Sequence, residues 1–466
     1  MLLTTCSGTS WRDIHKMKFL INNIMIYNIN KLKIFFQFIY KMLKISKRLF
    51  SDMRKIKTPP IVYIQGEEMT KYTMDLIMNK WINKYLDTSN WKFYDLSCKN
   101  RDITDDKCLY DAVEDGKVLR SIFKEPTITP SEYQKYKLNL TKSLPSPNGY
   151  MRKEWNGITI SRDTIHIKNL DLGYKNQVLF DRHAVGGEYT AGFKEVNSGT
   201  LITTFHPDKD FSTILVDQRN LKDKNNVVVT YHTPLDNVNI MADEFFNRCL
   251  KYNVTPYVVT KKTVFKWQES FWKIIKDVFD EKYKTKFNKL NLLERTNNDL
   301  MHLISDAATM NIIKWKEGGF GMISHNYDGD MLSDEISQMH FSPGFITSNF
   351  IGMNSNNDII KQFEASHGTV SDMWEDHLKG KETSLNPLGM IHALISAINY
   401  SVKIDTTNDY NKEEILLFTK NLQNIVNEAF VDGNCTRDLN KNGLTTEEFI
   451  KNIENKLFDF HSKHLR

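Results

Sequence analysis

Cysteine pairs and long apolar runs are both missing from this sequence. Its five cysteines lie singly among 466 residues, with no Cys-x-x-Cys pair. This argues against a disulfide framework and fits a reducing compartment. No apolar run reaches the roughly 18–20 residues that a membrane-spanning helix requires, so we expect no membrane insertion. There is no internal repeat, and 40% apolar with 26% charged residues is the composition of a globular protein.

Positive charge is scarce outside the N-terminal segment. Residues 1–57 contain twelve Lys or Arg and two Asp, a balance of +10, whereas the whole chain carries only +5. Residues 58–466 therefore sum to −5. Because binding to phosphate backbones needs a basic surface, this mildly acidic body argues against nucleic acid as the main partner.

The first 52 residues are basic, poor in acids and amphipathic, and they run into Lys47-Arg48-Leu49-Phe50-Ser51. This pattern is typical of an organelle transit peptide. We therefore interpret residues 1–52 as a transit peptide or basic leader and expect a mitochondrial matrix location. A merely basic tail is the alternative, since Lys, Asn and Ile are enriched along the whole chain.

Hydrophobic periodicity predicts an α/β fold. The run Ile61-Val62-Tyr63-Ile64 indicates a strand, and residues 67–85 have helical spacing of apolar side chains. A second strand is expected at residues 91–96, and further helices at residues 265–287 and 410–430. Residues 189–234 differ, because short β-rich pieces alternate there with polar turns, which indicates an inserted β module.

Two carboxylates suggest a metal site. If a helix begins near Asp330, then Asp330 and Asp334 project from the same face. Paired carboxylates without His or Cys suit Mg²⁺ or Mn²⁺. The alternative is structural, because an Asp before a helix also serves as an N-cap.

Arginine is rare here, with 13 among 62 basic residues, so its clustering at Arg152, Arg162 and Arg182 is informative. Its planar fork binds carboxylates in a bidentate manner, although surface placement is the alternative.

Lys261 follows the apolar run 256–260, where a strand would end and where ligands of α/β proteins collect. It is either an acid/base group or a solvated loop lysine.

Ten short motifs follow one another along the chain and include Ser146-Pro147-Asn148-Gly149 and Glu382-Thr383-Ser384-Leu385-Asn386-Pro387. The full set occupies residues 65–70, 100–102, 127–130, 146–149, 181–184, 260–263, 317–320, 326–334, 364–370 and 382–387. In this order the motifs resemble those of the NADP-dependent isocitrate dehydrogenases of the homodimeric eukaryotic type.

The resemblance implies isocitrate dehydrogenase-like large and small α/β domains with an inserted β-rich clasp, assembled as a homodimer. The implied large domain comprises residues 56–155 and 341–466. The small domain comprises residues 156–186 and 235–340, and the clasp comprises residues 187–234.

The resemblance also assigns site residues. Isocitrate is expected to bind Thr129, Ser146, Asn148, Arg152, Arg162 and Arg182. Tyr189 is the expected catalytic partner of a Lys261 supplied by the second subunit. The metal ligands are expected to be Asp330, Asp334 and Asp306, the last supplied across the dimer. Cofactor-binding positions are Thr127, Gln134, His367, Gly368, Thr369, Val370, Asp372 and Asn386.

Departures from the family gather at the nucleotide. Gln134, Asp372 and Met373 stand where the family has Arg, Arg and His. A carboxylate repels a 2′-phosphate but accepts hydrogen bonds from the free 2′-hydroxyl of NAD. Ser305-Asp306 likewise replaces a pair of adjacent acids.

We therefore expect metal-dependent oxidative decarboxylation of isocitrate to 2-oxoglutarate and CO₂, with reduction of NADP, as the family implies, or of NAD, as Asp372 suggests. The alternative is a catalytically impaired paralogue that acts as a regulatory or structural subunit. A dehydrogenase for another 2-hydroxy acid is disfavoured, because Ser146 and Asn148 are both present.

Overall fold

The computed structural model describes residues 54–209 and 212–464, and the expected leader at residues 1–52 lies outside them. A mixed ten-stranded sheet organises the chain from residue 56 onward, in the order β13-β12-β14-β7-β6-β15-β16-β5-β2-β4. Strand β6 runs antiparallel to β7 and β15, and β15 also runs antiparallel to β16, whereas the other pairs are parallel. The expected α/β class is confirmed. The strands are β2 Val62–Gln65, β4 Lys92–Asp95, β5 Ser121–Lys124, β6 Thr159–Asp163, β7 Val178–His183, β12 Thr255–Thr260, β13 Met301–Ile304, β14 Phe320–Ser324, β15 Thr347–Met353 and β16 Ile359–Ala365.

The strand, turn and helix expected near the N-terminal end of the described chain are present. Strand β2 leads through Gly66 into α2 (Glu68–Ile77), followed by one π turn (Met78–Ile82) and α3 (Asn83–Tyr85). A Cβ on Gly66 would lie 1.9 Å from the carbonyl oxygen of Pro126. Glycine is therefore required where this turn passes the loop after β5.

The half of the sheet from β13 to β7 is covered on both faces. Leu179 points to a core formed with α8 (Val238–Tyr252), α9 (Glu269–Lys282) and α10 (Lys284–Lys289). Its neighbour Phe180 points to the opposite core, formed with α11 (Ser305–Lys314) and α12 (Asn326–Met339). This alternation follows from the period of two along a strand. The helix expected at residues 265–287 is thus two helices, with Tyr283 between them.

The other half of the sheet packs on α5 (Lys107–Leu119) and α7 (Pro147–Glu154) through one apolar core. Helix α14 (Leu388–Ile404) contacts β5, where the hydroxyl of Ser121 donates to the carbonyl of Ala397 over 2.7 Å. The helix expected at residues 410–430 is α15 (Lys412–Val431), which precedes α16 (Thr446–His464). Shorter helices are α4 (Cys98–Ile103), α6 (Glu132–Leu138) and α13 (Ser371–Leu378). Among the described helices, none has the length and apolar character to cross a bilayer.

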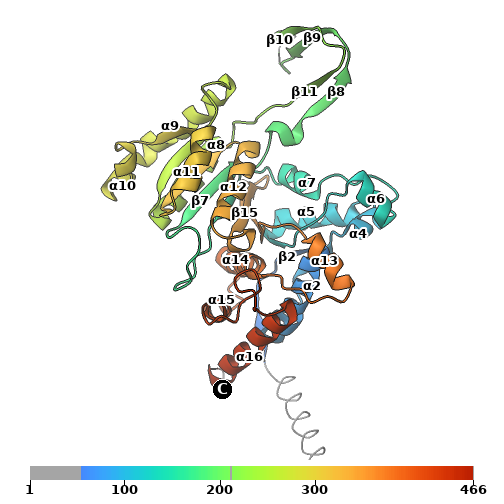
Figure 1. Ribbon diagram of the computed structural model, residues 1–466, viewed down its shortest axis with the longest axis vertical. Coiled ribbons are helices and arrows are strands. Elements are labelled where there is room, and N and C mark those ends of the chain that lie inside the picture. Colours follow the sequence, from blue (N-terminus) through green and yellow to red (C-terminus); the bar gives the residue numbers. More distant parts are fainter. Residues whose placement is uncertain (1–53, 210–211, 465–466) are drawn as a thin grey trace, which may run out of the picture. The chain divides into compact units, whose positions relative to one another are not determined.

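Residues 192–209 and 212–230 form two antiparallel two-stranded sheets that extend away from the ten-stranded sheet (Figure 1). We call this segment the arm. It comprises β8 (Gly192–Val196) with β11 (Asn226–Thr230), and β9 (Gly199–Phe205) with β10 (Ile214–Leu221). The arm exposes several large apolar side chains, an arrangement typical of an interaction surface. They are Phe193, Ile202, Phe205, Ile214, Leu215, Val216, Val227 and Val229.

Candidate active site

A cavity of about 1210 Å³ opens where β5, β7 and β16 end. Ligands of α/β folds collect at such carboxyl ends. The cavity gathers most of the expected substrate residues and both central carboxylates, although they come from distant parts of the chain. The expected residues that line it are Thr127, Ser146, Asn148, Arg152, Arg162, Arg182, Tyr189, Asp330, Asp334, His367 and Gly368.

Helix α12 presents both carboxylates to the cavity. It begins at Asn326 with His325 as its N-cap, so Asp330 lies inside the helix and the N-cap interpretation of Asp330 was wrong. Gly329 explains how closely α12 approaches β7, because a Cβ there would lie 2.4 Å from the Cβ of Arg182. This approach places Asp330 against the guanidinium group of Arg182.

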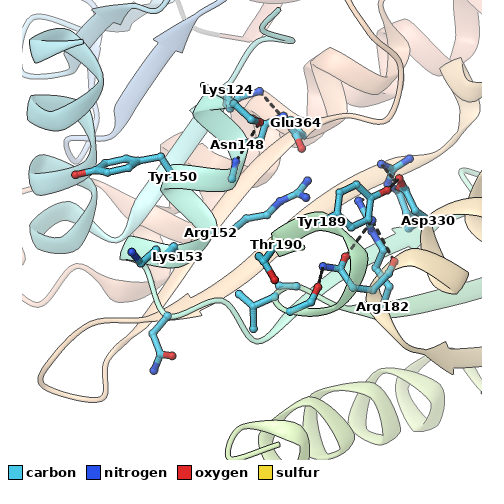
Figure 2. A pocket seen from close by; sticks show the side chains of 18 of the residues that line it. Lys124, Asn148, Tyr150, Arg152, Lys153, Arg182, Tyr189, Thr190, Asp330 and Glu364 are labelled. Atoms are coloured by element: carbon cyan, nitrogen blue, oxygen red, sulfur yellow. Dashed lines mark hydrogen bonds and ion pairs between the residues drawn. The ribbon is translucent and has the colours of Figure 1, made fainter. Parts of the chain in front are cut away.

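The guanidinium groups of two arginines lie close to these carboxylates. Arg182 Nη2 lies 2.9 Å from Asp330 Oδ1, and Arg162 Nη1 lies 3.3 Å from Asp334 Oδ1. The hydroxyl of Tyr189, from a short 3₁₀ turn, donates to Asp330. Arg152 projects from α7 into the space beside them (Figure 2). The sequence had indicated an arginine cluster and a carboxylate pair, and in the structure they form one site.

The cavity favours an anionic ligand. Burial lowers the pKa of Arg182 to about 10, and the positive charge of Arg152 contributes to this shift. Burial also lowers the pKa of Arg152. Buried guanidinium groups so close together gain from an additional negative charge.

Polar atoms in the cavity are unsatisfied. The Nε atoms of Arg162 and Arg182, Asn148 Oδ1 and Thr127 Oγ1 are buried without a hydrogen-bond partner. Buried polar groups in folded proteins are almost always paired. A ligand that carries several carboxylates and a hydroxyl group would supply partners of both kinds.

Sequence reasoning missed Lys124 and Glu364, which form a buried ion pair of 2.8 Å at the wall of the cavity. Burial alone would raise the pKa of Glu364, but Lys124, Arg152 and Arg162 outweigh it and hold that pKa below its ordinary value. A signal for Lys124 was present, because a charged residue directly follows the apolar pair Ile122-Phe123 at the end of a strand.

Lys261 and Asp306 lie outside the cavity of their own chain. Lys261 directly follows β12, as expected, and its ammonium group pairs with Asp306 in the first turn of α11. The hydrogen bond from Lys261 lowers the pKa of Asp306. Thr129 is exposed and does not line the cavity either. One chain therefore brings together Tyr189 and Asp330 but not Lys261.

The loop after β16 leads past His367 into α13 and carries several of the expected cofactor residues. Glu68 fixes this loop by accepting hydrogen bonds from Thr369 (2.6 Å) and Ser371 (2.5 Å). Val370 has a φ of +59°, which is strained for a β-branched residue. Asp372 is exposed in the first turn of α13.

The remaining expected cofactor residues, Gln134 and Asn386, make hydrogen bonds that stabilise nearby segments of the chain. Gln134 forms a capping box with Ser131 at the start of α6, with bonds of 3.0 and 3.2 Å. Asn386 donates to Asp438 over 2.9 Å. Lys137 of α6 and Glu375 of α13 form an ion pair of 2.8 Å. Helices α6 and α13 are therefore neighbours.

Comparison with known proteins identifies the family. The family model for isocitrate/isopropylmalate dehydrogenase matches residues 58–453. The chain belongs to this family. It is 54% identical over 413 residues to "Isocitrate dehydrogenase [NAD(+)] 1, mitochondrial" of Phaeodactylum tricornutum, covering 87% of this chain and 75% of that protein. It is 32% identical over 419 residues to "Isocitrate dehydrogenase [NADP]" of Saccharomyces cerevisiae, covering 87% and 96%.

A solved structure of the family confirms the isocitrate dehydrogenase-like fold. It is the crystal structure of isocitrate dehydrogenase from Ostreococcus tauri in complex with isocitrate and magnesium(II). That chain is 52% identical to this one, and the match covers 86% of this chain and 100% of that chain, with a TM-score of 0.82.

The site residues fit a divalent cation. Asp330 and Asp334 offer carboxylate oxygens one helical turn apart, the ligand type that Mg²⁺ prefers. Among residues 54–209 and 212–464, no group of three or more His, Cys, Asp or Glu side chains is placed to hold a metal ion. Two carboxylates nevertheless suffice for Mg²⁺, which usually completes its shell with substrate oxygens and water.

Proposed function

We propose that the protein is an NAD-dependent isocitrate dehydrogenase that decarboxylates isocitrate to 2-oxoglutarate and CO₂ with the help of Mg²⁺ or Mn²⁺. The observation that carries this proposal is the meeting of three arginines with Asp330 and Asp334 in one cavity. The arginines match the carboxylates of isocitrate, and the two Asp side chains match the metal.

Different residues of the chain would bind the substrate and transfer protons. Arg152, Arg162 and Arg182 hold the substrate carboxylates and orient C2. A metal held by Asp330 and Asp334 would supply a Lewis acid for the substrate oxygens, and a bound nicotinamide would supply the hydride acceptor. Burial, aided by Asp330, raises the pKa of Tyr189. Tyr189 thus stays protonated at neutral pH and can donate a proton at C3.

The proton of the C2 hydroxyl requires a base, and we assign this role to Lys261 of a second copy, which accepts the proton in its neutral amine form. In its own chain Lys261 pairs with Asp306, and neither side chain reaches the cavity. A dimer would explain why the Lys261 and Asp306 side chains lie outside the cavity of their own chain. It would also cover the apolar side chains of the arm.

The arm gives a test of the dimer. Phe193 and Val229 face each other across β8 and β11, and both side chains are more than half exposed. Replacing both with Asp should give a monomer by light scattering and remove most activity, because Lys261 then cannot reach a second cavity. Lys194→Glu, which changes the opposite face of β8, serves as the control and should stay dimeric. A fully active monomer would refute the assignment of Lys261.

Three observations favour NAD over NADP. Asp372 places a negative charge in the first turn of α13. The side chain of Gln134 is engaged with the backbone of Ser131. Two relatives named for NAD(+) are 54% and 52% identical to this chain, whereas four relatives named for NADP are 31–32% identical.

The alternative of an impaired subunit lacks support, because the arginines, Tyr189 and both carboxylates occur together and the relatives are named as dehydrogenases. We further propose a mitochondrial matrix location. Two relatives are named mitochondrial, and residues 1–52 have the composition of a transit peptide.

Arg182→Lys tests the substrate site. Lysine keeps the charge but loses the bidentate fork, so kcat/KM for isocitrate should fall by at least tenfold, given ~1.5–3 kcal/mol for a charge-assisted hydrogen bond. The measurement is steady-state formation of NADH and 2-oxoglutarate with Mg²⁺, with the variant's folding checked by circular dichroism. Wild-type kinetics in the variant would remove Arg182 from the site.

A further inference from the structure

We propose that Arg101, which does not touch the cavity, is a positioning residue for isocitrate, because it fixes the loop that delivers α7 to the active site. The inference rests on the proposed function. It concerns how the substrate site is held in place rather than which groups contact the substrate.

Helix α7 carries three of the expected substrate residues. Ser146 is its N-cap, with its hydroxyl accepting from Gly149 N over 3.3 Å, while Asn148 and Arg152 lie within the helix. The chain between α6 and α7, residues 139–146, contains neither helix nor strand. The position of the first turn of α7 therefore depends on what holds this connecting loop.

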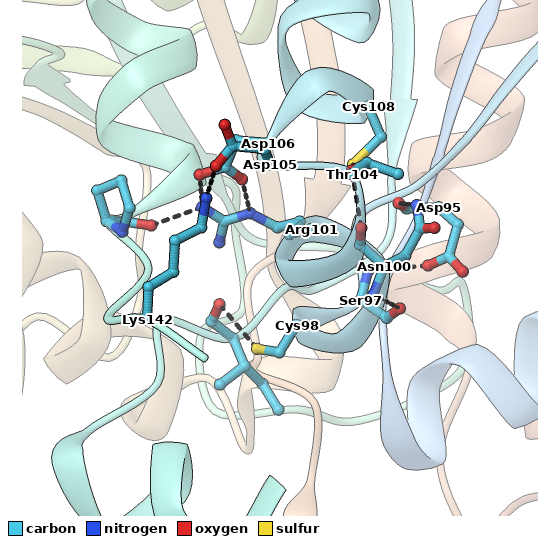
Figure 3. A network of polar contacts seen from close by, with 12 residues as sticks. Asp95, Ser97, Cys98, Asn100, Arg101, Thr104, Asp105, Asp106, Cys108 and Lys142 are labelled. Atoms are coloured by element: carbon cyan, nitrogen blue, oxygen red, sulfur yellow. Dashed lines mark hydrogen bonds and ion pairs between the residues drawn. The ribbon is translucent and has the colours of Figure 1, made fainter. Parts of the chain in front are cut away.

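One short segment, residues 98–106, holds the loop at three points. Figure 3 shows one of them, the pairing of Lys142 with Asp105 beside Arg101. Arg101 Nη2 donates to the carbonyl of Pro145 over 2.9 Å, directly before Ser146. The carboxylate of Asp102 accepts from the amide and hydroxyl of Thr141, the latter over 2.8 Å. Lys142 pairs with Asp105. These links tie the loop to α4 and to the turn that follows it.

Arg101 is the buried member of this set. Its side chain is fully buried, and its fork donates to Asp106 through Nε (2.7 Å) and Nη2 (3.3 Å). Asp105 and Asp106 have φ values of +54° and +61°, which are uncommon for residues other than glycine. The amide of Asp106 donates back to the carbonyl of Arg101 over 2.8 Å. The guanidinium thus fixes a strained turn and the Pro145 carbonyl at once.

A lysine in place of Arg101 cannot bind the Asp106 carboxylate and the Pro145 carbonyl at the same time. Its single ammonium group can pair with Asp106 or reach Pro145, but it lacks the rigid fork that serves both acceptors. A displacement of about 1 Å in a positioning element is enough to impair catalysis. Loss of the contact between Arg101 and Pro145 should therefore raise the KM for isocitrate more than any other kinetic parameter. Glu68, Thr369 and Ser371, where we expect the nucleotide, are bonded to one another rather than to the connecting loop and should be little affected.

The test compares full-length wild type with Arg101→Lys. We expect the KM for isocitrate to rise about tenfold or more, with the KM for NAD and kcat within about threefold of wild type. Arg120→Lys, which alters an arginine–carboxylate pair at the opposite end of β5, is the control and should change neither KM. An unchanged isocitrate KM, or equal increases for both substrates, would overturn the proposal.

A second variant covers the case in which Arg101→Lys does not fold. Asp102→Asn with Thr141→Val loosens the same loop from its partly exposed side and should raise the isocitrate KM selectively, whereas no change would count against the role of the loop. Hydrogen exchange without substrate separates this inference from the proposed function. In Arg101→Lys, amides of residues 141–150 should exchange faster than in wild type, even if isocitrate proved not to be the substrate.

Discussion

Asp330→Asn is expected to lower kcat with isocitrate and Mg²⁺ by at least about 100-fold. Replacing groups that merely support metal ligands costs 10–100-fold, and Asp330 is a proposed ligand. The change also removes the carboxylate that Arg182 contacts at 2.9 Å and to which Tyr189 donates. Initial rates over a range of Mn²⁺ concentrations would measure the effect, and metal affinity should fall together with activity.

A neighbouring carboxylate provides the control. Asp328 lies on the same helix two positions earlier, and it does not line the main cavity. Asp328→Asn should therefore keep the metal dependence of the wild type. If Asp330→Asn kept it as well, the carboxylates of α12 would have no part in metal binding.

Asp372→Arg combined with Met373→His is expected to shift the preference between nucleotides towards NADP by at least about 100-fold. The double change removes a negative charge from the first turn of α13 and adds two donors. Each charge-assisted contact is worth ~1.5–3 kcal/mol. The ratio of kcat/KM values for NADP and NAD is the measurement.

The same helix provides a matched control for this prediction. Asp376→Arg places arginine beside the native His377, one turn further along α13. It makes a similar change of charge at a different position. If this control altered the preference as much as the double variant, the effect would be one of net charge rather than of contact with the 2′-phosphate.

Local patterns predicted much of the fold. Helix α15 was expected at residues 410–430 and spans Lys412–Val431, because its apolar spacing is long and regular. The β module was expected at residues 189–234, and strands β8 to β11 lie between Gly192 and Thr230. The start of α12 was misplaced near Asp330. His325, its actual N-cap, makes no side-chain cap bond and so left no signal in the sequence.

The sequence predicted which residues form the site better than it predicted how they contact one another. Asp330 and Asp334 could be paired from their spacing, because a helix fixes residues four apart on one face. That Arg182 would meet Asp330 depends on the close packing of α12 on β7 at Gly329, a contact between distant segments. Lys124 with Glu364 and Arg101 with Pro145 were missed for the same reason, since each joins residues separated by long stretches of chain.

The most direct test is the initial rate of reduced nucleotide formation by the purified full-length protein with isocitrate and Mn²⁺, measured in parallel with NAD and with NADP. We expect isocitrate-dependent NADH formation that requires the metal, at a kcat/KM at least equal to that with NADP. A strong preference for NADP would mean that Asp372 does not select the nucleotide, and no turnover with either nucleotide would refute the proposed function.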